Sequence, residues 1–269
     1  MKKKVLALLL MAALFCFAAA PALASPAQLV YIYPEDSGQY TWVLDVSSGS
    51  VSTDPIFIIG MDTNYQVHEL TEEEEGLLLW TIPSSDAAQF SNGQKTYTGN
   101  EPVITVTGRD ENITVTCYYD YNQNGIDSSD ISVPIFLVGE HDSDAHLNVT
   151  GITITINGED VDDFTMSNQT INRFDVSAAT GGDDDTDVLK KNPSMVHALL
   201  QALNTHYGAG WTATNVDMMS EGGYVSDIDG DGSADGYWLY EVNGADPGHA
   251  AGAHQLHPGD VVTWTFYPY

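Results

Sequence analysis

Short apolar segments separated by polar turns fill the chain from Pro26 to about Asn157. They are rich in β-branched and aromatic residues, and clusters of Gly, Asn, Asp and Ser separate them at regular intervals, which is typical of antiparallel strands. Eight such segments begin at Leu29, Thr41, Pro55, Leu77, Pro102, Ile113, Ser132 and Val149. Between them, Thr71 and Glu74 form a capping-box signal that predicts a single helical turn. The pattern predicts an antiparallel β-sandwich of the immunoglobulin-like type.

One long segment has helical rather than strand periodicity. It reads NPSMVHALLQALNTHYG, with Asn192 as the expected N-cap, Pro193 at the first helical position and Gly208 just past the end. An apolar stripe at helical spacing is formed by Val196, Leu199, Leu200, Leu203 and Tyr207. We expect this stripe to face a core and His197, on the opposite face, to be solvated.

Two aromatic segments near the C-terminal end alternate as strands do, Tyr237–Val242 and Val261–Tyr267. A turn signal follows the first segment at Asn243-Gly244, and another precedes the second at Pro258-Gly259. Alternation directs one set of side chains in each strand to the core and the other set to the surface. Exposed aromatic side chains of this kind usually mark a ligand or partner site.

These elements predict a mainly β protein in three parts. Residues 1–24 combine three lysines, an apolar run and small residues before Ser25, as in a cleavable secretory signal. Residues 25–157 form the sandwich, and residues 158–269 form a small α+β domain with one main helix. We place the boundary between residues 147 and 170. No later segment has the roughly 20 apolar residues of a membrane helix, so we expect a secreted or cell-surface protein.

Acidic residues dominate the charge, with 38 Asp and Glu against 8 Lys and Arg and a formal net charge of −30. Nucleic acid and anionic membrane surfaces are excluded as direct partners because such a chain repels them. Outside the leader Cys117 is the only cysteine, so stability must come from packing or bound metal rather than an internal disulfide. Cys117 alternates with Ile113, Val115 and Tyr119, which predicts a buried thiol.

Alternating carboxylates next to a glycine predict a structural calcium loop ahead of the first aromatic strand. The pattern D-x-D-x-D-G-x-x-D places oxygen ligands around a hard cation, and the seventh position adds a main-chain carbonyl. The candidate ligands are Asp227, Asp229, Asp231, Ser233 and Asp235. The alternative is an acidic turn without an ion. A weaker version, either an ion site or an Asn-rich hairpin, comprises Asp120, Asn122, Asn124, Asp127 and Asp130.

Three histidines lie within nine residues, at His249, His254 and His257. Imidazoles bind borderline metals, but no Cys or carboxylate is interleaved at zinc-site spacing, so solvent-exposed turn residues are the favoured interpretation. The sequence contains no nucleophile-elbow, zinc-protease, phosphate-loop, dinucleotide or haem-attachment motif. We therefore expect a protein that is not an enzyme.

Three segments together resemble the transcobalamin-like C-terminal domain of bacterial exported proteins and animal cobalamin carriers: NPSMVHALLQAL, YWLYEVNGAD and HQLHPGDVVTWTF. The resemblance begins at Ile152 or Thr170 and ends at Phe266, and it is most specific at Trp238–Gly244 and Pro258–Trp264. It implies a small α+β unit in which one helix packs on a β-grasp-like sheet.

The resemblance also implies that the ligand is cobalamin, another corrinoid or a different small planar molecule. The contacts it implies are Trp238, Tyr240, Asn243, Gly244, His254 and Trp264. In the carriers a helical barrel forms the second wall of the site, and this β-rich chain has no such barrel. The alternative from a different class is a calcium-stabilised structural or adhesive protein of the cell surface, with another surface protein as its partner.

Overall fold

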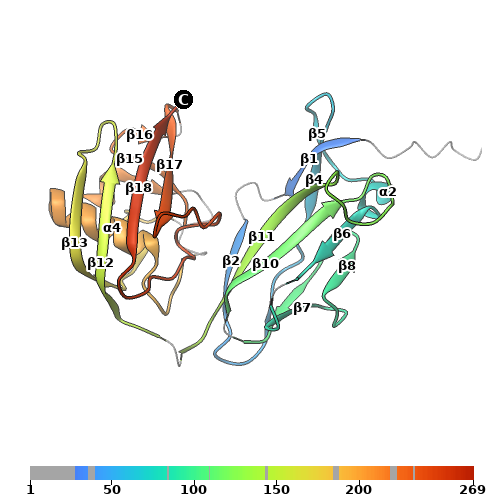
Figure 1. Ribbon diagram of the computed structural model, residues 1–269, viewed down its shortest axis with the longest axis horizontal. Coiled ribbons are helices and arrows are strands. Elements are labelled where there is room, and N and C mark those ends of the chain that lie inside the picture. Colours follow the sequence, from blue (N-terminus) through green and yellow to red (C-terminus); the bar gives the residue numbers. More distant parts are fainter. Residues whose placement is uncertain are drawn as a thin grey trace, which may run out of the picture.

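The computed structural model describes residues 28–35, 40–83, 85–108, 110–142, 145–183, 188–218, 223–232 and 234–269. The expected leader, residues 1–24, lies outside these ranges. The fold is mainly β and has two units side by side, each with its own hydrophobic core (Figure 1). Within the described ranges, no helix has the length and apolar character needed to cross a membrane.

The first unit is a β-sandwich of short strands. Its strands are β1 (Leu29–Pro34), β2 (Thr41–Asp45), β3 (Val51–Ser52), β4 (Ile58–Asp62), β5 (Val67–Glu69), β6 (Leu78–Thr81), β7 (Ala88–Phe90), β8 (Thr96–Thr98), β9 (Ile104–Val106), β10 (Asp110–Tyr119) and β11 (Ile131–Glu140). They form sheets of order β2-β11-β10-β6-β8, β1-β4-β5 and β3-β9-β7. Strand pairing in this unit is antiparallel except between β2 and β11, which run parallel.

The core of the first unit confirms the alternation in β10. Ile113, Val115 and Cys117 have no exposed surface, and Tyr119 is 2% exposed. Burial raises the pKa of the Cys117 thiol, which therefore stays protonated and unreactive. The predicted helical turn is also present as α2 (Glu72–Glu75), where Thr71 and Glu74 form the capping box.

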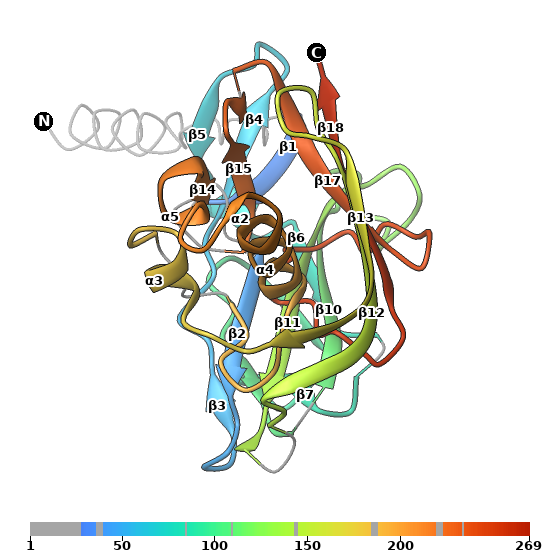
Figure 2. The ribbon, with the colours of Figure 1, turned by 90° about the vertical axis from the view of Figure 1, so that its left-hand side faces the viewer.

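The second unit is a mixed sheet with one main helix. Its elements are β12 (Asn148–Asn157), β13 (Phe164–Asn172), α3 (Val176–Ala179), α4 (Met195–Tyr207), α5 (Thr212–Asn215), β14 (Val216–Met218), β15 (Val225–Ile228), β16 (Asp231–Gly232), β17 (Gly236–Val242) and β18 (Val261–Pro268). The main sheet has the order β13-β12-β18-β17, with β12 and β18 parallel in its centre. Helix α4 packs across this sheet, as the turned view shows (Figure 2). This arrangement is the β-grasp-like one that was expected.

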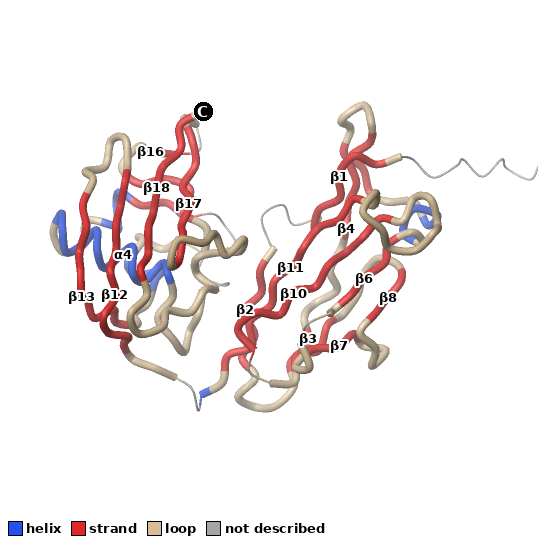
Figure 3. Tube along the Cα trace, in the orientation of Figure 1, coloured by secondary structure: helices blue, strands red, loops and turns tan. Residues whose placement is uncertain are grey.

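The boundary between the units lies earlier than the expected end of the sandwich at Asn157. Strand β12 pairs with β13 and β18 of the second unit, and its residues Ile152, Ile154 and Ile156 are fully buried in the second core. Ile152, Ile154 and Ile156 alternate along the chain as the residues of the sandwich strands do, so the sequence pattern could not show to which unit β12 belongs. The boundary falls between Glu140 and Asn148, where the chain crosses from one unit to the other (Figure 3).

Helix α4 begins two residues later than expected. Ser194, rather than Asn192, is the N-cap, and its N–H donates to Nδ1 of His197 at 3.1 Å. His197 Nε2 lies 3.1 Å from the carbonyl oxygen of Phe174. The expectation that His197 is a solvated surface residue is therefore wrong, because its side chain is 1% exposed and both ring nitrogens have partners.

Glu140, at the end of β11, ties the two units together. Its buried carboxylate accepts hydrogen bonds from the N–H groups of Lys190 (2.8 Å) and Lys191 (3.0 Å). The Lys191 ammonium then pairs with two carboxylates, that of Asp45 in the first unit at 3.1 Å and that of Asp142 in the connecting segment at 2.6 Å. A small apolar cluster beside them consists of Val138, Leu189 and Ala253. The units are thus joined by polar and apolar contacts outside the connecting segment.

Candidate functional site

A cavity of about 260 Å³ lies in the second unit beside strand β17. We call it the aromatic pocket. Its lining residues are Gly223, Tyr224, Val225, Trp238, Leu239, Tyr240, Asp246, Gly248, His249, Ala251 and Trp264. Three of the expected ligand contacts, Trp238, Tyr240 and Trp264, meet at this cavity.

The pairing of β17 with β18 places these aromatic side chains. Tyr240 lies opposite Trp264 in the antiparallel register, and their ring centroids are 5.3 Å apart. Side chains alternate along both strands, so Trp238, Tyr240 and Trp264 are only 8%, 7% and 2% exposed. The prediction that one set faces the core is confirmed, and the pocket-lining rings belong to that set.

The other set of aromatic side chains lies on the solvent side of the same strands. Tyr237 stacks on Tyr267 with a centroid distance of 5.7 Å and lies 6.1 Å from Tyr269. All three rings are exposed. The expected exposed aromatic surface is therefore present on the face opposite the pocket, and its residues are not those that the resemblance implied.

Hydrogen bonds fix two of the three inward rings. The Trp238 indole N–H donates to the carbonyl oxygen of Asp231 at 2.8 Å, and the Tyr240 hydroxyl donates to that of His249 at 2.8 Å. Burial raises the pKa of Tyr240, so its hydroxyl keeps its proton. The buried indole N–H of Trp264 has no hydrogen-bond partner among the described residues.

The segment after β17 forms another wall of the pocket and is more buried than expected. Nδ1 of His254 lies 3.1 Å from Nε2 of His249, and desolvation lowers the pKa of both side chains, that of His254 to about 4. His249 also packs on Phe136 of the first unit, with ring centroids 5.2 Å apart. The interpretation as solvent-exposed turn residues holds for His257, which is exposed, and is wrong for His249, which is 8% exposed.

Asn243 and Gly244 lie at the turn after β17 and do not line the pocket. Both have positive φ, 54° and 79°, and they connect the paired residues Val242 and Ala245. The Asn243 side chain donates to Asp260 at 2.9 Å and accepts from the N–H of Val261 at 3.0 Å. The predicted turn is present, and these contacts give Asn243 a role in holding two turns together.

The predicted calcium loop, residues 227–235, is called the Asp loop here, and its first part forms a tight hairpin between β15 and β16. Asp229 and Gly230 are its two central residues, with φ values of 53° and 102°, as a type I′ turn requires. The buried Asp231 carboxylate accepts hydrogen bonds from the N–H groups of Glu159 (2.7 Å), Asp160 (2.9 Å) and Val161 (3.2 Å). Asp231 thus caps the turn between β12 and β13.

The remaining carboxylates of the Asp loop do not gather around one point in the described residues. Asp227 accepts from the N–H of Gly230 at 2.9 Å, Asp235 is exposed, and Ser233 lies outside the described residues. No group of three or more His, Cys, Asp or Glu side chains suited to a metal ion occurs in the part of the chain that the structure describes. Calcium at this loop stays a prediction.

The weaker ion-site candidate forms the hairpin loop between β10 and β11. Asp120 accepts from the N–H groups of Asn124 (3.1 Å) and Gly125 (2.9 Å), and the Asn124 side chain donates to Asp127 at 2.8 Å. Asn122 also accepts from the N–H of Asn124, and Asp130 from that of Asp127. The loop is thus held by its own hydrogen bonds, and an ion at this loop stays a prediction.

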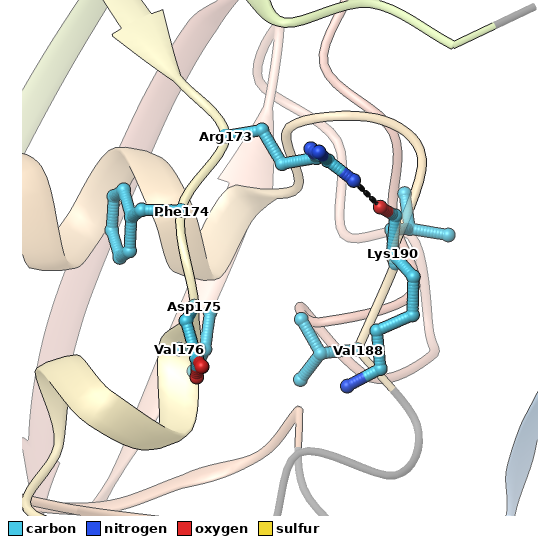
Figure 4. A pocket seen from close by; sticks show the side chains of 7 residues that line it. Arg173, Phe174, Asp175, Val176, Val188 and Lys190 are labelled. Carbon is cyan, nitrogen blue, oxygen red and sulfur yellow. Dashed lines mark hydrogen bonds between the residues drawn. The ribbon is translucent and has the colours of Figure 1, made fainter.

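Two other cavities contain none of the expected site residues. One, of about 430 Å³, is lined by Arg173, Phe174, Asp175, Val176, Val188, Leu189 and Lys190, and there the Arg173 guanidinium donates to the carbonyl oxygen of Lys190 (Figure 4). The other, of about 340 Å³, lies in the first unit and is lined by Glu35, Phe57, Ile58, Ile59, Glu69, Leu70, Glu75, Asn100 and Glu101. The aromatic pocket is therefore the cavity that the sequence indicated.

Comparison with known proteins places this pocket inside one family match. A family model described as a domain of unknown function (DUF4430) matches residues 195–267. No protein with a curated description matches the chain. Among solved structures, the chain is similar to the crystal structure of mouse cadherin-23 EC22-24, with 14% identity, 86% of this chain and 65% of that chain covered, and a TM-score of 0.25. Every residue that lines the aromatic pocket falls within the family match.

Proposed function

We propose that the protein is an exported, non-enzymatic binding protein that takes a small ligand into the aromatic pocket. The observation that carries this proposal is the convergence of Trp238, Tyr240 and Trp264 on one cavity. Ligand sites are typically concave and apolar, with a few polar groups that orient the ligand. The leader-like residues 1–24 and the strongly acidic composition support a location outside the cell.

The size of the pocket bears on the ligand. At about 260 Å³ it lies just below the roughly 300–1,000 Å³ of typical ligand sites. A single small ring or a group of that size enters whole, whereas a corrinoid inserts only a peripheral group. The resemblance to transcobalamin-like domains supports corrinoids as ligands to test first.

Titration of the purified protein by calorimetry tests this proposal. The probes are cobalamin, cobinamide and indole, and the heat of binding is the readout for each of them. Tyr224→Ala, which changes a half-buried pocket residue, should weaken binding. Its control is Tyr237→Ala, on the solvent side of β17, which should leave binding unchanged. Absence of heat with all three probes at high micromolar concentration would contradict the proposal.

A second candidate function is a structural or adhesive role at the cell surface. The exposed stack of Tyr237, Tyr267 and Tyr269 supports it, because exposed aromatic rings often mark a contact with a partner. The ties between the two units through Glu140 and Lys191 suit a rigid extracellular module. Beads coated with the protein should attach to the cell surface that the protein contacts. Replacement of Tyr237 and Tyr267 by Ser should abolish this attachment. Attachment that is unchanged would count against this role.

A further inference from the structure

The wall of the aromatic pocket is rich in π-electron surface. Tyr224, Trp238, Tyr240 and Trp264 all line it, and together they come from β17, β18 and the segment that leads into β15. The face of an aromatic ring carries partial negative charge, so a cation within about 6 Å of several rings is attracted to them. Trp and Tyr are the strongest side chains for this interaction.

The charge at the pocket has one sign. Among the described lining residues Asp246 is the one carboxylate, and no lysine or arginine of the described ranges lines the cavity. Burial has the largest effect on the pKa of Tyr240, which it raises, and on the pKa of His249, which it lowers. The nearby Asp246 carboxylate makes a smaller contribution that raises the pKa of each group. His249 adds no positive charge at neutral pH, because desolvation lowers its pKa and outweighs the opposite effect of the Pro247 carbonyl oxygen, which lies 3.0 Å from Nδ1.

We infer that the aromatic pocket binds a small organic cation of the alkylammonium class, held by Trp238 and Tyr240 and paired with Asp246. This inference rests on the proposed function and names its ligand class. A cavity of about 260 Å³ is wide enough for a trimethylammonium group. A bare metal ion is a poorer ligand, since calcium takes six to eight oxygen ligands and one carboxylate supplies at most two. The net charge of −30 adds a field that concentrates cations near the chain.

The test compares choline with its neutral isostere 3,3-dimethylbutan-1-ol, in which carbon replaces nitrogen. Both are titrated into the purified full chain by calorimetry and tryptophan fluorescence, with NaCl used to match ionic strength. Cation–π attraction at a partly desolvated site is worth about 1–2 kcal/mol, so choline should bind roughly tenfold more tightly than the alcohol. Tetramethylammonium should bind like choline.

Two variants with the same change in charge separate a specific site from general attraction. Asp246→Asn removes the charge and keeps an oxygen to accept the hydrogen bond that Asp246 receives from the N–H of Gly248 at 2.7 Å. It should weaken choline binding roughly fivefold and leave the alcohol unchanged. Glu241→Gln, at an exposed residue of β17 that does not line the pocket, should leave both unchanged.

Three results would overturn the inference, and they differ in what they leave standing. Equal affinity for choline and the alcohol refutes a cation site and leaves a small-ligand pocket. Equal weakening of choline binding by Asp246→Asn and Glu241→Gln shows general attraction to an acidic chain. If choline and the alcohol fail to bind while indole or a corrinoid binds, the inference fails and the proposed function stands; if indole and both corrinoids fail as well, the two fail together.

Discussion

Nδ1 of His254 lies 3.1 Å from Nε2 of His249, and the two rings stack with centroids 5.0 Å apart. The Pro247 carbonyl oxygen accepts from Nδ1 of His249, so Nε2 of that ring carries a lone pair and accepts from His254. This chain of hydrogen bonds requires His249 to be neutral, and His254 donates from its protonated Nδ1. Since His249 also packs on Phe136, the pair lies where the two units meet.

Stability should fall as the pH falls through the range in which the histidines gain protons. Burial, and then the charge of His249, lower the pKa of folded His254 from 6.5 to about 4. The unfolded chain binds more protons between these values, so the stability contributed by the neutral pair is complete above pH 6.5 and is lost towards pH 4. After discounting for partial exposure, we expect a loss on the order of 1–2 kcal/mol, measured by urea unfolding at pH 7 and pH 4.5.

The control for this pH dependence is a neutral replacement of His254. His254→Gln should reduce the difference in unfolding free energy between pH 7 and pH 4.5. His257→Gln, at an exposed residue, should leave that difference as in the unaltered protein. A pH dependence that is identical in all three proteins would show that the histidine pair is not responsible.

Two tryptophans that line the pocket should differ in their response to the same substitution. Trp238→Phe removes the indole donor to Asp231, whereas Trp264→Phe removes a donor that has no partner among the described residues. Both changes remove similar aromatic area, so the hydrogen bond decides the difference. Trp238→Phe should destabilise by about 1–2 kcal/mol more than Trp264→Phe in chemical denaturation. Equal losses would argue against the bonding pattern described above.

Asp231 should be the stability-determining acidic residue of the Asp loop. Its buried carboxylate satisfies three main-chain N–H groups, and Asp231→Asn places an amide donor against them. We expect a loss of at least about 2 kcal/mol in unfolding free energy. Asp229→Asn is the matched control, because Asp229 is exposed and Asn tolerates its positive φ.

Calcium at the same loop can be tested independently of Asp231. A bound structural ion stabilises the folded state by an amount that grows with the logarithm of its concentration relative to Kd, so chelation should lower the melting temperature and added calcium should restore it. Asp227→Asn should remove this response if the loop holds the ion. A melting temperature that chelation does not change would refute structural calcium, and the hairpin without an ion would stand.

Loss of the Glu140 carboxylate should loosen the contact between the units. Glu140→Ala leaves two N–H groups of the second unit without an acceptor, which costs about 1–3 kcal/mol for each buried group. Hydrogen exchange at Lys190 and Lys191 should accelerate accordingly. Asp142→Ala removes a surface ion pair with Lys191 and should cost less than about 1 kcal/mol. Similar exchange rates in the two variants would contradict a special role for Glu140.

Strand and helix positions followed closely from the sequence because alternation and capping are local signals. The ten expected strands and the main helix are present, whereas β3, β5, β7 and β8, with two or three residues each, are too short for a periodic signal. The boundary was less predictable. Strand β12 alternates like the sandwich strands before it, and only its long-range pairing with β18 assigns it to the second unit.

The candidate site could be predicted in part for the same reason. Trp238, Tyr240 and Trp264 share one face through local alternation, which the sequence displays. Tyr224, Asp246 and His249 reach the pocket from loops, and loop positions depend on tertiary contacts such as that between His249 and Phe136. Buried histidines are therefore easily mistaken for turn residues in a segment rich in Gly and Ala.

The parallel pair of β12 and β18 has a consequence for how the protein reaches its folded state. The strand nearest the C-terminal end lies between β12 and β17, in the middle of the sheet. Until Val261–Pro268 can form β18, Ile154 and Ile156 of β12 lack the neighbouring strand with which they pair. Pairing over such a long sequence separation is slow. A chain that must cross a membrane unfolded, as the proposed export requires, would thus delay the closure of its second unit until Val261–Pro268 have passed.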